Sequence, residues 1–172
     1  MDELAITVVG HDRPGIIADV SEVLARLSLN LTDSTMTLLR GHFAMTLVCS
    51  GGTDAVAVET ALAGLAAADE LAVTVRPLHP EDVPGAVGVR HVLNVHGADR
   101  LGIVAGVTRV VANAGGNITD LTTRLVDELY VLVAEVDLPS TVDLERVTAT
   151  LHDEAEALGV EANLRPVETD LL

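Results

Sequence analysis

Hydrophobic and polar positions recur along this chain with two periods, close to two in some stretches and close to 3.6 in others. Residues 3–9 alternate and are rich in β-branched side chains, which predicts a strand. After a turn at 10–14, the helical period appears at Ile16, Val20, Val23, Leu24 and Leu27. The same reasoning predicts strands at 30–39, 42–50 and 71–78, and helices at 16–28 and 54–68.

Turn and cap signals delimit these elements. We expect Asp12 to cap the first helix and Pro14 to lie in its first turn, where a missing N–H is tolerated. Arg40 and Gly41 are expected to form a hairpin turn, and Thr53 is the expected N-cap of the second helix. The period of two places four residues of the strand at 42–50 on one face, namely Phe43, Met45, Leu47 and Cys49.

The second half of the chain shows the same order of elements. Strands are predicted at 90–96, 117–126, 129–136 and 160–166, with a helix at 102–114. Ser140 and Asp143 have capping-box spacing and predict the start of a last helix that stops at Gly159. We expect its core side to be lined by Leu144, Val147, Leu151 and Leu158.

The two halves are copies of one unit. Val8–Ala18 matches Val95–Ala105 at an offset of 87 residues, and the match continues without a gap from Asn30–Asp33 onto Asn117–Asp120. Unrelated segments do not share so many positions, so the chain is a tandem repeat. We expect a first domain at 1–79, a linker at 80–88, a second domain at 89–166 and a loose tail at 167–172.

Each unit therefore has the order βαββαβ, which predicts an α+β fold of the ferredoxin-like type. We expect a four-stranded antiparallel sheet with both helices on one face and right-handed crossovers. Strands one and three are expected to lie in the middle and to be parallel. The second strand forms an edge, and because edges invite pairing, we expect the two units to pair side by side.

Composition narrows the range of functions. The chain has a formal net charge of −16, and its ten basic residues are all arginines. So acidic a chain has no basic stripe for phosphates, which argues against direct binding of nucleic acids or of a membrane surface. One cysteine, no stretch long enough to span a bilayer and a first strand that follows the N-terminus directly predict a cytoplasmic protein without a signal peptide.

The turn after the first strand is the best candidate for chemistry. Gly10 and Gly15 permit a close approach of the backbone, and the helix that follows presents free N–H groups and a positive dipole end. These groups suit a carboxylate, and Asp12 can accept hydrogen bonds from an α-ammonium group. We expect Asn30 to lie at the same end of the sheet. Together these features fit an amino acid, although such a turn can also serve only to start a helix.

Other polar residues give weaker indications. Arg13 and Arg100 are candidates to pair with a ligand carboxylate, or they are solvated surface arginines. His11 has no counterpart in the second copy, where Ala98 stands. The histidines show no metal-ligand spacing, and no nucleophile, Walker or dinucleotide motif occurs. We therefore predict no metal site, no cofactor and no catalytic residue.

The motif Gly10-His11-Asp12-Arg13-Pro14-Gly15-Ile16, followed by Asn30-Leu31-Thr32-Asp33, resembles the ACT domain, a regulatory amino-acid-binding module. The chain is covered by two such units, a layout similar to that of the glycine cleavage system transcriptional repressor family. The second copy departs from the motif at Ala98 and Leu101. The resemblance implies a ligand site between paired units, formed by Gly10, His11, Asp12, Arg13, Pro14, Gly15, Ile16, Asn30 and Leu31, with Gly97, Ala98, Asp99, Arg100, Leu101, Gly102, Ile103, Asn117 and Ile118 in the second copy.

These expectations describe a non-enzymatic regulator that binds an amino acid between ACT units and signals through a protein partner. Its expected role is to regulate the transcription of genes of amino-acid metabolism. Two alternatives stay open. One is a structural or interaction module that needs no ligand, and the other is a small ferredoxin-like enzyme. The sequence also leaves open the identity of the amino acid and of the partner, and whether the chain is a monomer or a homodimer.

Overall fold

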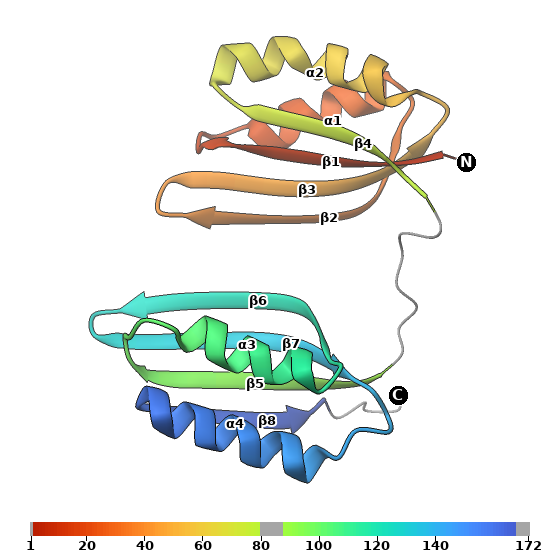
Figure 1. Cartoon of the computed structure of the whole chain (residues 1–172). Helices are drawn as coiled ribbons and strands as arrows, with labels where there is room; N and C mark the ends of the chain where they lie inside the picture. The colour runs from red at the N-terminus through yellow and green to blue at the C-terminus, as the bar shows by residue number, and fades with distance from the viewer. Residues whose placement is uncertain (1, 80–87, 168–172) are drawn as a thin grey trace. The chain divides into compact units, whose positions relative to one another are not determined.

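The computed structural model describes residues 2–79 and 88–167, and the predicted linker, apart from Gly88, and the tail beyond Val167 lie outside these ranges. The described residues form two compact units (Figure 1). The first contains β1 (Asp2–His11), α1 (Ile16–Arg26), β2 (Asn30–Leu39), β3 (His42–Gly51), α2 (Ala55–Asp69) and β4 (Ala72–Leu78). The second contains β5 (Val89–Ala98), α3 (Ile103–Asn113), β6 (Asn117–Val126), β7 (Leu129–Leu138), α4 (Leu144–Leu158) and β8 (Val160–Pro166).

Each unit has the predicted βαββαβ order, so the expected fold class is confirmed. The strand order is β2-β3-β1-β4 in one sheet and β6-β7-β5-β8 in the other. All pairings in both sheets are antiparallel. The expectation that the two central strands run parallel is wrong. The crossover through α1 makes β2 parallel to β1, and the hairpin turn then sends β3 back between them, antiparallel to both.

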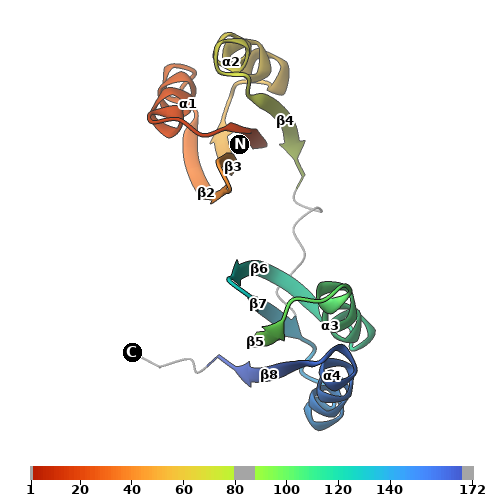
Figure 2. The same ribbon diagram turned by 90° about the vertical axis from the view of Figure 1, so that its left-hand side faces the viewer.

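The two helices of each unit cover one face of its sheet, as Figure 2 shows. The hydrophobic core of the unit lies between that face and the helices. Alternate residues of the central strands point into it, and the predicted inward face of β3 is buried at Phe43, Met45, Leu47 and Cys49. Residues at helical spacing in α1 meet them, with Ile16, Val20 and Leu24 buried. Aliphatic side chains on one face of the sheet and on one stripe of each helix are thus removed from water. This burial is the main favourable contribution to the folding free energy of each unit.

The α2 helix begins one residue later than expected. Asp54, not Thr53, is the N-cap, and its carboxylate accepts a hydrogen bond from the Ala57 N–H at 2.8 Å. The Thr53 hydroxyl instead donates to the carbonyl of Leu27 at 2.9 Å, which ties this loop to the end of α1. Both residues suit an N-cap by type, and the loop contact decides between them.

The α4 helix also differs from expectation in its first turn. Asp143 is the N-cap and accepts a hydrogen bond from the Arg146 N–H at 3.1 Å, so Ser140 does not cap this helix. Leu144 was expected in the core but is 36% exposed, whereas Ala155, which the pattern did not single out, is 1% exposed. Ala155 belongs to the buried core cluster of the second unit, and Leu144 does not.

The repeat extends to irregular features of the backbone. Both edge strands contain a register shift at the same place, between Leu31 and Asp33 and between Ile118 and Asp120. In the first unit the extra residue, Thr32, donates its hydroxyl to the Val48 carbonyl at 3.1 Å. These shifts reset which side chains point toward the helices, so the two edge strands present equivalent faces.

Candidate functional site

The structure places the predicted site residues on four short segments. In the first unit, Gly10 and His11 end β1, Asp12, Arg13 and Pro14 form the turn, Gly15 and Ile16 begin α1, and Asn30 and Leu31 begin β2. In the second unit, Gly97 and Ala98 end β5, Asp99, Arg100 and Leu101 form the turn, Gly102 and Ile103 begin α3, and Asn117 and Ile118 begin β6.

The turn between β1 and α1 ends on a glycine in a left-handed conformation. Gly15 is the N-cap of α1 with φ 95° and ψ −9°, and no side chain caps the helix. The expectation that Asp12 caps it is therefore wrong, and Pro14 lies before the N-cap instead of in the first helical turn. The N–H groups of the first turn have no side-chain acceptor at the cap, which leaves a partial positive charge at this end of α1.

The rest of the turn is tied to neighbouring elements. The Asp12 N–H donates to the Gly41 carbonyl in the β2–β3 hairpin at 3.0 Å. One guanidinium nitrogen of Arg13 lies 2.7 Å from a carboxylate oxygen of Asp19 in α1, and another donates to the Pro14 carbonyl at 2.9 Å. A ligand carboxylate would therefore compete with Asp19 for Arg13.

The corresponding turn of the second unit has the same backbone and different surroundings. Gly102 has φ 95° and ψ −7°, and it too lacks a side-chain cap. Arg100, however, lies against Gly159 at the end of α4, where a Cβ added to the glycine would be 3.0 Å from the guanidinium carbon. Leu101, which replaces Pro14, is 100% exposed. The backbone conformation of the turn is thus duplicated, whereas the contacts of its arginine differ between the units.

Not every predicted site residue can offer its side chain to a ligand. Ile16 and Ile103 are 1% and 2% exposed because they open the core face of α1 and α3. Only their backbone N–H groups are available. Ile17, the next residue of α1, is 47% exposed. It lines a groove of about 180 Å³ between α1 and the β2–β3 hairpin, and Leu31 and Met36 line the same groove.

Gly10 and Gly97 have a packing role that differs from the one expected. Both lie in strands, paired with Phe43 and Tyr130, and not in the turn. A Cβ on Gly10 would lie 2.5 Å from a methyl carbon of Leu71, and one on Gly97 would lie 2.9 Å from the Cα of Val160. The chain that leaves α2 or α4 crosses at these points, so the close approach is to the protein's own backbone.

Asn30 does not lie at the same end of the sheet as the turn, and that expectation is wrong. His11 and Leu39 are both level with His42 on β3, whereas Asn30 is level with Ser50. About eight residues of β3 separate the two positions, or roughly 26 Å at the rise of a strand. A crossover helix returns the chain to the start of a parallel strand, so Asn30 comes back to the end where β1 begins. In the second unit Asn117 is level with Asp137, also far from the turn.

His42 is a residue near the turn that the sequence did not indicate. Its ring centroid lies 5.0 Å from that of His11, because the two residues are partners in the β1–β3 ladder. The second unit has Ala98 opposite Leu129 at this position. Only the register between β1 and β3 brings His42 next to His11. Those two strands are separated in sequence by α1 and β2, so local patterns do not reveal this register.

The described residues offer little support for catalysis. No group of three or more histidine, cysteine, aspartate or glutamate side chains in residues 2–79 and 88–167 could hold a metal ion. Burial raises the pKa of the Cys49 thiol, which disfavours the reactive thiolate. Within these same ranges, the helices are too short or too polar to cross a bilayer.

Comparison with known proteins gives consistent matches over both units. The sequence model of the ACT domain matches residues 2–76 and 90–165. A UPF0237 protein of Methanocaldococcus jannaschii is 37% identical over 73 residues, which cover 42% of this chain and 81% of that protein. A UPF0237 protein of Pyrobaculum aerophilum is 39% identical over 70 residues, covering 40% and 78% of the two chains.

Two of the solved structures that match almost the whole chain also have TM-scores above 0.7. The crystal structure of an unknown protein from Galdieria sulphuraria has a TM-score of 0.82 and 30% identity, and the match covers 96% of this chain and 98% of that one. The crystal structure of a putative glycine cleavage system transcriptional repressor has a TM-score of 0.73 and 23% identity, with 96% and 97% covered. At that identity the second match shows the shared fold.

Proposed function

Since this chain belongs to the ACT domain family, we propose that it is a non-enzymatic regulatory protein that binds an amino acid between paired ACT units. ACT domains are ligand-binding regulatory domains, and two of them account for the described residues. The proposed ligand site is the strand–helix turn of each unit, with the start of an edge strand. We place the protein in the cytoplasm, where free amino acids are available.

The observation that carries this proposal is the duplicated helix start. Gly15 and Gly102 have φ values of 95° and leave the first turns of α1 and α3 without a side-chain cap. Backbone N–H groups at such an end can donate to a ligand carboxylate without any basic side chain. Asp12 and Asp99 stand in the turns and are exposed, so they can accept hydrogen bonds from an α-ammonium group. A zwitterion satisfies both halves of this arrangement.

Asn30 and Leu31 can join such a site only from a second unit. The β2 strand is an edge of its sheet and runs from Asn30 to Leu39, with Leu39 level with His42 beside the turn. Two edge strands that pair antiparallel place the first residue of one beside the last residue of the other. We therefore propose that Asn30 of one ACT unit completes the site at the turn of another, in this chain or in a second copy.

The proposed output is a protein–protein contact that changes when the ligand binds. We further propose that the protein regulates transcription. This is supported by the fold that it shares with the putative glycine cleavage system transcriptional repressor. With a net charge of −16, such a regulator would act through a protein partner and not by touching DNA.

A thermal-shift screen against the twenty amino acids tests the proposal. At about 10 mM, a ligand with a Kd near 0.1 mM adds roughly 2.7 kcal/mol of stability by mass action. That corresponds to roughly 5–10 °C in Tm for a chain of this size. Asp12→Ala or Asn30→Ala should reduce the shift, whereas Asp153→Ala, an exposed carboxylate on α4, should leave it unchanged.

A ligand-independent interaction module is the second candidate, because the edge strands expose apolar side chains. Met36 and Leu38 of β2 are 46% and 48% exposed, and Leu125 and Val126 of β6 are 42% and 60% exposed. Such edges favour association. If none of the twenty amino acids changes Tm while the chain associates with itself or a partner, this second function replaces the first.

A further inference from the structure

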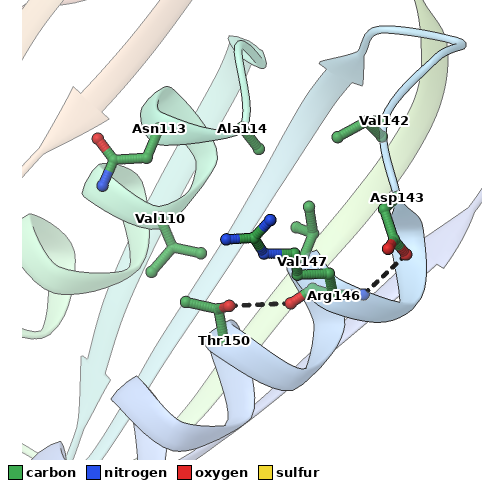
Figure 3. A pocket seen from close by; sticks show the side chains of 8 residues that line it. All are labelled: Val110, Asn113, Ala114, Val142, Asp143, Arg146, Val147 and Thr150. Atoms are coloured by element: carbon green, nitrogen blue, oxygen red, sulfur yellow. Dashed lines mark hydrogen bonds between the residues drawn. The ribbon is translucent and has the colours of Figure 1, made fainter.

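The second unit contains a groove that shares no lining residue with the strand–helix turn. It lies between α3 and α4, has a volume of about 460 Å³, and has an apolar base that includes Val110 and Val147 (Figure 3). Those two side chains are 8% and 6% exposed, so the groove reaches the edge of the core. Its volume is within the range of about 300–1,000 Å³ that is typical of small-molecule sites.

Arg146 of α4 is the cation of this groove. Figure 3 shows its side chain extending from α4 toward α3. Among the described residues, the ion pairs of the chain involve other arginines and His96, and no carboxylate lies within 4.0 Å of the Arg146 guanidinium. The nearby carboxylate of Asp143 accepts a hydrogen bond from the Arg146 backbone N–H instead.

The position of Arg146 has no evident structural advantage. It is the third residue of α4 after the N-cap Asp143, in the first turn, where the helix dipole disfavours a cation. The equivalent position of the first unit, three residues after the N-cap Asp54, is Ala57. Arg26, at the position equivalent to Asn113, pairs with Glu22 of its own helix. The first unit thus lacks this cation, so the fold itself does not require it.

We propose that the α3–α4 groove binds a small aliphatic carboxylate, such as a branched-chain acid of five or six carbons. The carboxylate pairs with the guanidinium of Arg146, which can donate two parallel hydrogen bonds to it. The branched aliphatic part covers Val110, Val142 and Val147. This site belongs to the second unit alone and goes beyond the amino-acid site at the turns.

Methyl NMR of the full chain with labelled valines tests this proposal. The probe is 4-methylpentanoate, added to about 20 mM, and the uncharged 4-methylpentanamide is its matched control. The acid should give saturable shifts of the Val110, Val142 and Val147 methyl signals. The amide should bind at least about tenfold more weakly, because it lacks the charge that Arg146 recognises.

Variants separate recognition of charge from folding. Arg146→Met keeps an unbranched apolar stem and removes the charge, so it should weaken binding of the acid at least about tenfold. Arg146→Lys should weaken it less, because the charge remains without the planar fork. Arg124→Met, an exposed arginine of β6, should leave binding unchanged.

Four results would overturn the proposal. Three of them are equal binding of the acid and the amide, unchanged binding in Arg146→Met, and no saturable shift of the three valines in the wild type. Shifts that depend on protein concentration alone would assign the groove to a contact with another chain, and they too would overturn it. Because the valines of the second unit report the binding, failure here is distinguishable from failure of the amino-acid site.

Discussion

Replacement of Gly10 or Gly97 by alanine tests whether these strand glycines are needed because neighbouring atoms leave no room for a Cβ. In Gly97→Ala the new Cβ would lie 2.8 Å from a methyl carbon of Val160, 2.9 Å from its Cα and 3.0 Å from its Cβ. In Gly10→Ala it would lie 2.5 Å from a methyl carbon of Leu71, but the nearest backbone atoms are 3.1 and 3.2 Å away. A methyl group can rotate aside, whereas backbone paired in a ladder cannot move alone.

The two substitutions should therefore differ in magnitude. Overpacking of this kind lowers the free energy of unfolding by about 1–3 kcal/mol. We expect Gly97→Ala at the upper end of that range, near 3 kcal/mol, and Gly10→Ala nearer 1 kcal/mol. Gly52→Ala is the matched control, since no atom lies within 4 Å of its added Cβ. It should change stability by less than about 1 kcal/mol, and toward greater stability.

Native-state hydrogen exchange followed by mass spectrometry can assign each loss to its unit. Gly97→Ala should lower protection in β5 and β8 and leave the first unit as it was, and Gly10→Ala should do the reverse. Calorimetry should show Tm falling by about 4–8 °C per kcal/mol for units of this size. If Gly97→Ala leaves β5 and β8 fully protected, or if Gly52→Ala is as damaging, then close backbone approach does not explain these glycines.

Further substitutions test individual contacts. Asp54→Ala and Asp143→Ala should each lower the free energy of unfolding by about 1 kcal/mol in urea titrations, because each removes an N-cap hydrogen bond. Gly15→Ala should lower Tm through backbone strain of about 1–3 kcal/mol, and an unchanged Tm would mean that the turn relaxes. Arg13→Gln should lower stability by less than about 1 kcal/mol, since its ion pair is partly exposed. Burial raises the pKa of Cys49, so the native chain should react slowly with a thiol reagent and should lose stability as pH rises above the ordinary thiol pKa, where the unfolded chain deprotonates first.

The elements could be predicted where local patterns determine them. The strands that begin at Asn30, Asn117 and Val160 have the predicted bounds, because glycine or turn residues precede alternating side chains. The hairpin at Arg40 and Gly41 was also predictable, and both residues have positive φ, at 50° and 82°. These features depend on residues that are close in sequence, so a short window contains the cause.

Other features depend on residues that are far apart, and these predictions were wrong. The role of Gly10 depends on Leu71, which approaches it only after two helices and two more strands have formed. The placement of Asn30 depends on the ladder direction between β1, β3 and β2. The choice of Asp54 over Thr53 as N-cap depends on a bond from Thr53 to Leu27. In each case the sequence offered suitable residue types, and tertiary structure selected among them.

The two copies have diverged around a shared backbone, which suggests different roles for them. Both turns place a left-handed glycine before a helix without a side-chain cap, so the backbone geometry on which the proposed ligand site depends is common to both. In the first unit Arg13 is held by Asp19 and the turn is joined to the hairpin at Gly41. In the second unit Arg100 lies against Gly159 instead.

These differences bear on how ligand binding could be sensed. In the first unit the Asp12 N–H bond to the Gly41 carbonyl joins the turn directly to the β2–β3 hairpin, and thus to the end of the β2 edge. A turn whose arginine lies on Gly159 is linked instead to the end of α4, the helix that carries Arg146 in its first turn. We therefore expect ligands at the first turn to act on association through β2, and ligands at the second turn to act on the α3–α4 groove. Hydrogen exchange of β2 and of α4 during an amino-acid titration would distinguish the two routes, and equal protection of both elements at every ligand concentration would refute this division.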